Sequence, residues 1–141
     1  MVAAYQEVTR DWWRSAPDRF VLYASALVMS ESRTGDPEAA RARLGVLGTL
    51  PLLDATGPAV ELTGKLLEQG AVPRNAAEDA AHIAIAAVNG VDYLVTWNFR
   101  HIANATMRSR IEDVCRRSGY GPPVICTPSE LVETRHARDA D

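Results

Sequence analysis

Residues 75–98 read NAAEDAAHIAIAAVNGVDYLVTWN and combine a small-residue helix, a glycine stop and an apolar strand in one unit. Asp79 lies on that helix, on a face otherwise lined by alanine, and Asn98 comes directly after the strand. In open α/β sheets, ligands bind in the crevice beyond the carboxyl ends of the strands. This stretch therefore predicts an acid and an amide at the edge of the sheet where binding sites form.

Strands and helices alternate through the rest of the chain as well. The predicted strands are short, continuous apolar runs at 20–24, 50–53, 93–97 and 124–126. Continuous runs of this kind are typical of a parallel sheet that is covered by helices on both faces. The helices are predicted at 2–15, where Pro17 ends the first of them, and at 26–32, 37–50, 58–69, 76–89, 99–118 and from 128 onward.

Capping residues mark several of the predicted helix starts. Asp36 precedes a proline at the first helical position, and Asn75 and Thr127 each have a glutamate three residues later. These patterns satisfy the free N–H groups of a first helical turn. Glycine residues are expected to close three helices, at positions 70, 90 and 119.

Composition and charge narrow the class of protein. With 141 residues and 47% hydrophobic residues, the chain predicts one domain over residues 1–132, followed by a mobile tail at 133–141. A net charge of −3 gives no overall attraction to nucleic acid or to an anionic membrane. Cys115 and Cys126 form no C-x-x-C motif and are interpreted as small buried hydrophobic residues in a reducing compartment.

Membrane insertion and secretion are not expected from the sequence. No apolar run approaches the roughly 20 residues that span a bilayer. The first residues, MVAAYQEVTRDWW, contain two acids and lack the charged-then-apolar pattern of a signal peptide. A cytoplasmic location is therefore expected.

Several common catalytic motifs are absent, and acidic and amide residues near strand ends are what remains. The chain has no glycine-rich phosphate loop, no G-x-S-x-G elbow and no zinc-type spacing among its histidines. The remaining candidates are Glu31, Asp79 and Asn98. Two carboxylates at about 4 Å repel by roughly 4 kcal/mol at an effective dielectric of 20, so a divalent cation would make such a cluster tolerable.

Three segments together resemble the PIN domain, in particular the VapC-type toxins of bacterial toxin–antitoxin pairs. They are LYASALVMSESRTGDPEAA at 22–40, NAAEDAAHIAIAAVNGVDYLVTWNFRHIANA at 75–105 and GYGPPVICTPSEL at 119–131. Within the second, the D-A-x-H-I-A element followed by T-W-N is fairly specific for one PIN subgroup, and the resemblance covers about residues 4–132. The resemblance implies a PIN-like three-layer α/β/α fold with a parallel sheet, and a metal-dependent endoribonuclease that uses Mg²⁺ or Mn²⁺.

The resemblance also implies roles for individual residues. Glu31 would be the early-helix acid and Asp79 the mid-chain acid, both of them catalytic and both metal ligands. Asn98 would be the catalytic residue at the strand tip, and Thr96 would steady the site. The implied partners are an RNA substrate, an antitoxin protein and a second copy in a homodimer.

Residues Arg100 and His101 follow the strand tip and are candidates to contact an RNA phosphate. The basic residues of the following helix could also hold RNA backbone, because phosphate neutralisation drives such binding. A solvated first turn and a solvated helix face are the alternative interpretations.

One family element is missing from the pattern. PIN domains open with a central strand that ends in an acid, and the first predicted element here is the helix that would follow it. The first residue of the protein could be assigned too late, the sheet could close without this strand, or another chain could supply the strand. We expect impaired metal binding and nuclease activity, and a non-catalytic PIN relic that binds RNA or an antitoxin is the alternative function.

The candidate site residues also have plain structural interpretations. Asp79 could be a helix-dipole partner, Glu31 a solvated acid and Asn98 a helix cap, and His82 is expected to be a hydrogen-bonded structural residue. A third possibility is an unrelated α/β module whose polar strand tips bind a small ligand.

Overall fold

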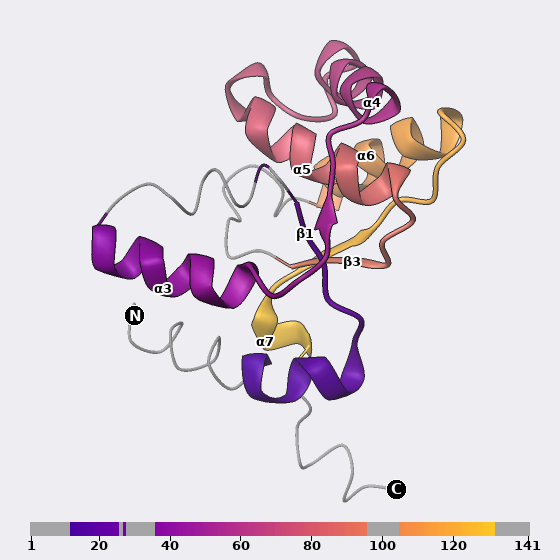
Figure 1. Cartoon of the computed structure of the whole chain (residues 1–141). Coiled ribbons are helices and arrows are strands. Elements are labelled where there is room, and N and C mark those ends of the chain that lie inside the picture. Colours follow the sequence, from indigo (N-terminus) through magenta and orange to yellow (C-terminus); the bar gives the residue numbers. More distant parts are fainter. Residues whose placement is uncertain (1–11, 26, 28–35, 96–104, 132–141) are drawn as a thin grey trace, which may run out of the picture.

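The computed structural model describes residues 12–25, 27, 36–95 and 105–131 (Figure 1). This part is mixed α/β, as predicted, and residues 12–19 are helical. The further elements in chain order are β1 (Ala24–Ser25), α3 (Pro37–Leu47), β2 (Leu52–Leu53), α4 (Gly57–Glu68), the 3₁₀ helix η1 (Arg74–Ala76), α5 (Ala77–Val88), β3 (Tyr93–Val95), α6 (Ala105–Arg117), β4 (Val124–Cys126) and α7 (Pro128–Leu131).

The strands form two parallel pairs. β1 pairs with β2, and β3 pairs with β4, with Leu94 opposite Ile125. Parallel pairing agrees with the prediction, but over the described residues the two pairs are separate two-stranded sheets and not the single sheet that was expected. Each pair is joined by a crossover that contains a helix, α3 in the first and α6 in the second, as parallel strands require.

The first predicted strand is much shorter than expected. Only its last residue, Ala24, lies in the β1–β2 ladder, where its N–H donates to the carbonyl of Pro51 at 3.0 Å. Pro51 has no N–H to return, so the ladder cannot extend toward residues 20–23 on this side. Val21 is consequently 78% exposed instead of being buried in a sheet.

The first helix continues past the proline that was expected to end it. Residues 12–19 are helical, so Pro17 lies inside the helix and the prediction was wrong. A proline within a helix removes a single backbone bond, to the carbonyl four residues earlier. The next turn is still held by the Phe20 N–H, which donates to the Ala16 carbonyl at 2.8 Å, and Ala16 is fully buried.

Two of the three predicted caps are confirmed. The Ala39 N–H donates to the Asp36 carboxylate at 3.1 Å at the start of α3. At the start of α7, the Thr127 N–H donates to the Glu130 carboxylate, also at 3.1 Å. Both contacts satisfy N–H groups that have no partner within the helix.

The cap predicted at Asn75 was wrong. Asn75 lies inside η1, and Ala76 takes the capping position of α5 without a side-chain hydrogen bond. The chain enters α5 through this 3₁₀ turn, which is closed by the Ala76 N–H donating to the Pro73 carbonyl at 2.9 Å. A turn that leads directly into a helix takes over the role of a capping side chain.

Glycines end α4, α5 and α6 as predicted. Gly70, Gly90 and Gly119 have φ values of 72°, 70° and 91°. Residues with a side chain rarely adopt this left-handed conformation, whereas glycine adopts it without strain. Each helix therefore stops where the chain must turn toward the next element.

Replacing Asp36 with alanine is expected to lower the free energy of unfolding by about 1 kcal/mol, because the first turn of α3 loses its cap. Urea unfolding followed by circular dichroism measures this change. Asp54→Ala is the matched control, since Asp54 is an exposed residue of the segment that joins β2 to α4. Equal losses in the two variants would remove the capping role from Asp36.

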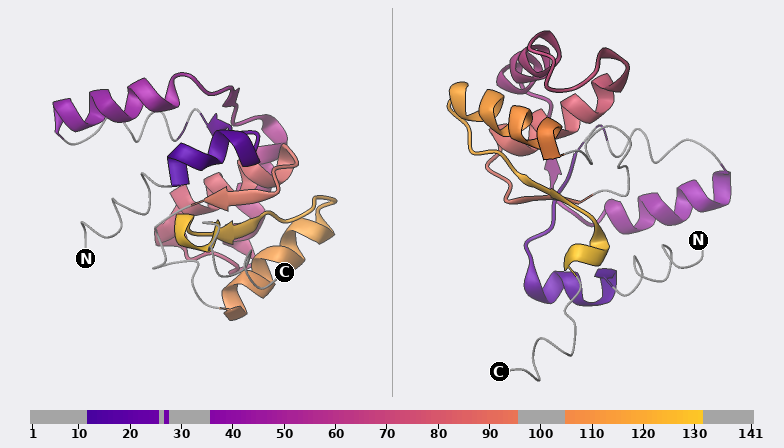
Figure 2. Two further views of the ribbon diagram at one scale, coloured as in Figure 1. Left: turned by 90° about the horizontal axis from the view of Figure 1, so that it is seen from below. Right: turned by 180° about the vertical axis from the view of Figure 1, so that it is seen from behind.

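Helices α4, α5 and α6 lie on one side of the β3–β4 pair (Figure 2), and their apolar side chains form the main core. In the same views, α3 extends away from this helical cluster (Figures 1 and 2). Leu94 and Ile125 pack against the core from the strands. The fully buried large residues of the core are Leu62, Leu66, Val72, Ile83, Ile111 and Cys115.

Both cysteines are buried and free, as the sequence predicted. Burial raises the pKa of Cys115 and of Cys126 to about 11, because the apolar surroundings disfavour the charged thiolate. Both thiols are therefore protonated and unreactive at neutral pH.

A thiol reagent is expected to label the folded protein slowly at pH 8 and to label both cysteines rapidly in denaturant. Fast labelling of the native protein would contradict the burial of the two cysteines.

The raised pKa values of the two cysteines also predict a pH effect on stability. The unfolded thiols ionise near their ordinary pKa of 9.0 and the folded ones near 11, so the free energy of unfolding should fall as the pH rises through this window.

Within the described part of the chain, no helix is long and apolar enough to cross a membrane.

Candidate functional site

Asp79 is the one predicted site residue that the structure describes. It lies in the first turn of α5, and its side chain is half-buried. The turn after α5 contains Gly90 and is held by the Val91 N–H donating to the Ala86 carbonyl at 2.9 Å. The chain reverses there and enters β3, so the first turn of α5 lies toward the carboxyl end of that strand (Figure 1).

This placement follows from the local sequence. Alanines at 80, 84 and 87 are buried and let α5 pack closely against its neighbours, and Ile83 fills the core between them. Asp79 falls next to this apolar surface and not within it, which leaves its carboxylate half-buried. A carboxylate in that position is held in a defined place while it remains accessible to a ligand.

His82 lies one helical turn after Asp79 and is also half-buried. Residues three apart on a helix lie on the same side, with Cβ atoms about 5–6 Å apart. Both side chains take part in interactions within the chain, so neither is without a partner. Glu78, the neighbouring acid, is exposed.

The other predicted site residues cannot be compared with the structure. Their positions lie outside the described residues, and the convergence of Glu31 with Asp79 stays a prediction. In the described ranges, no group of three or more histidine, cysteine or acidic side chains is arranged to hold a metal ion. The predicted residues outside these ranges are Glu31, Thr96, Asn98, Arg100 and His101.

The basic side predicted for the long helix is partly neutralised within α6. Arg116 lies 3.7 Å from the Glu112 carboxylate, and Arg117 lies 2.7 Å from the Asp113 carboxylate. Each acid precedes its arginine by four residues, the spacing at which exposed pairs support a helix by a few tenths of a kcal/mol. The charge that this helix offers to a phosphate backbone is therefore smaller than its arginine count indicates.

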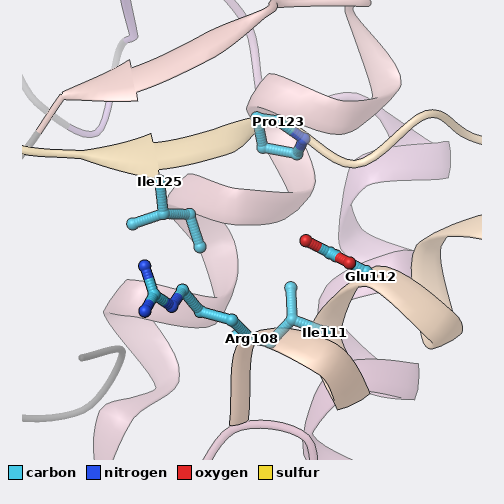
Figure 3. A pocket seen from close by; sticks show the side chains of 5 residues that line it. All are labelled: Arg108, Ile111, Glu112, Pro123 and Ile125. Atoms are coloured by element: carbon cyan, nitrogen blue, oxygen red, sulfur yellow. The ribbon is translucent and has the colours of Figure 1, made fainter. Parts of the chain in front are cut away.

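A shallow recess lies between α6 and β4 (Figure 3). Ile111, Pro123 and Ile125 form its apolar part, and the side chains of Arg108 and Glu112 extend beside it. Its volume of about 10 Å³ suits a single water molecule. None of these residues belongs to α5, so the recess is no part of the Asp79 site.

The sequence did not predict a contact that fastens the N-terminal helix to the C-terminal part of the domain. Arg19 donates to the carbonyl of Leu131 although the two are 112 residues apart. The guanidinium also lies 5.0 Å from the ring centre of Phe20, and that ring lies 5.9 Å from the ring of Tyr93. No local pattern signals such contacts, because they depend on elements distant in the chain.

Comparison with known proteins leaves the chain without an assigned family. No family model, no curated protein and no solved structure matches it. Functional inference therefore rests on the residues and on the geometry around Asp79.

Proposed function

We propose that the chain is a PIN-like, VapC-type domain that hydrolyses RNA with the help of a divalent metal ion. The observation that carries the proposal is the position of Asp79, which is half-buried in the first turn of α5, the end of this helix that lies toward the carboxyl end of the parallel strand β3. Sites in α/β proteins form at this end of the strands. The residues around Asp79 also form the D-A-x-H-I-A element, which is part of the family resemblance.

A divalent ion is compatible with the groups found there. Asp79 supplies a carboxylate oxygen, the ligand type that Mg²⁺ and Mn²⁺ accept, and partial burial strengthens its attraction for a cation. When bound, the ion supplies an activated water and offsets charge on the phosphate. Glu31 is proposed as the second metal ligand.

The residues near the strand tip are proposed to serve the substrate. Asn98 would act with the two acids, Thr96 would steady the site, and Arg100 and His101 would neutralise RNA phosphates, because such contacts provide most of the affinity for a nucleic-acid backbone. An antitoxin protein that covers the site, a homodimer and a cytoplasmic location belong to the same proposal.

The alternative is a non-catalytic relic of the same fold that binds RNA or an antitoxin.

Cleavage of a labelled RNA by the metal-stripped chain, with and without added Mn²⁺, distinguishes the two functions. The proposal expects cleavage that appears with Mn²⁺ and stops with a chelator. RNA binding without cleavage under both conditions would support the relic and overturn the nuclease.

A further inference from the structure

The sequence element D-x-x-H places two different metal-ligating groups on one side of α5. Asp79 and His82 are one helical turn apart, and both are half-buried. The same spacing of a carboxylate and an imidazole on a helix, Glu-x-x-His, directs both groups to one metal in carboxylate-bridged metal proteins. The spacing of the pair on α5 therefore suits the binding of one ion by both groups.

The surroundings of the pair make it the polar part of an otherwise apolar helix. Ile83 and Ala86, which follow on the same side at helical spacing, are buried. Glu78 is the only other acidic residue of α5, and it is exposed. Asp79 and His82 are thus the only partly covered groups of α5 that can ligate a metal.

We propose that His82 is a metal ligand beside Asp79, and that the site consequently prefers Mn²⁺ or a similar transition-metal ion to Mg²⁺. This inference rests on the proposed function and adds the choice of ion to it. Mg²⁺ is a hard ion that takes oxygen ligands, whereas imidazole nitrogen is a good ligand for the transition metals.

Both residues already interact within the chain. An ion that gains from both the carboxylate and the imidazole therefore has an advantage over one that gains from the carboxylate alone. The ratio of the two ion affinities is therefore the quantity to measure.

The test uses the full chain, stripped of metal, and follows binding of Mn²⁺ and of Mg²⁺ separately by titration calorimetry, with the electron paramagnetic resonance signal of free Mn²⁺ as a second readout. We expect Mn²⁺ to bind at least about tenfold more tightly than Mg²⁺. His82→Gln should weaken Mn²⁺ binding by about 10–100-fold and leave Mg²⁺ binding nearly unchanged.

Two further variants keep this inference separate from the proposed function. Asp79→Asn should weaken the binding of both ions, and Asp92→Asn should change neither, because Asp92 is exposed and comes after the opposite end of α5. Thermal unfolding followed by circular dichroism checks that each variant is folded.

If the ratio of Mn²⁺ affinity to Mg²⁺ affinity were unchanged in the His82→Gln variant, His82 would not be a metal ligand. If Asp79→Asn still lost both ions, the metal site of the proposed function would stand. A chain that binds neither ion would overturn both.

Discussion

Asp79→Asn is expected to abolish the Mn²⁺-dependent cleavage of RNA, with a loss of roughly 10²–10⁴-fold in rate. The substitution keeps the size of the side chain and removes the negative charge that would hold the ion. Metal ions contribute several kcal/mol of charge stabilisation in the transition state, and each 1.36 kcal/mol corresponds to a factor of ten in rate. Cleavage of a labelled RNA on a denaturing gel, in the presence of Mn²⁺, measures the effect.

Glu78→Gln is the matched control for this experiment. It removes the same charge from the preceding residue of α5, but Glu78 is exposed whereas Asp79 is half-buried. A general electrostatic effect on RNA binding would change cleavage in the same direction in both variants, while a specific site would be lost only with Asp79. Retained cleavage by a folded Asp79→Asn protein would remove Asp79 from the mechanism.

Leu66→Ala is expected to lower the free energy of unfolding by about 2–5 kcal/mol. Leu66 on α4 is 0% exposed and belongs to the core that α4, α5 and α6 share. Its truncation removes apolar contacts and leaves a cavity that close-packed neighbours fill only in part. A loss of this size is a large share of the roughly 5–15 kcal/mol that typically stabilises a domain.

Val60→Ala provides the comparison for Leu66→Ala. Val60 lies on the same helix but is 63% exposed, so its truncation removes little buried surface and should change the free energy of unfolding by less than about 0.5 kcal/mol. Urea unfolding of both variants, followed by circular dichroism, gives the two values. Similar losses would show that α4 is not packed as described.

Local signals in the sequence predicted the helices of the described residues and most of their ends. Asp36 caps α3, Thr127 and Glu130 form the box that begins α7, and glycines with positive φ follow α4, α5 and α6. These features depend on residues within four positions of one another, so their physical causes are present in the sequence itself. The strand at 124–126 and the burial of both cysteines were also predicted correctly.

Two of the errors occur where a nearby backbone group decides which hydrogen bonds are made. The turn closed by the Pro73 carbonyl leads the chain into α5, so Asn75 is not needed as a cap. Pro51 cannot donate to the β1–β2 ladder, so the apolar run at 20–24 forms little strand. A sequence pattern describes what a segment favours, but its neighbours decide which hydrogen bonds are made.

At the candidate site, the sequence alone placed Asp79 on a helix and His82 one turn after it, because helical spacing follows directly from residue numbers. Only the tertiary structure decided that Asp79 and His82 are half-buried while Glu78 is exposed. It also decided that the strands associate as β1–β2 and β3–β4, and that Arg19 reaches the carbonyl of Leu131. The physical reason is the range of the forces involved. Helix periodicity and capping act within a few residues, whereas burial and strand pairing depend on which distant segments pack together.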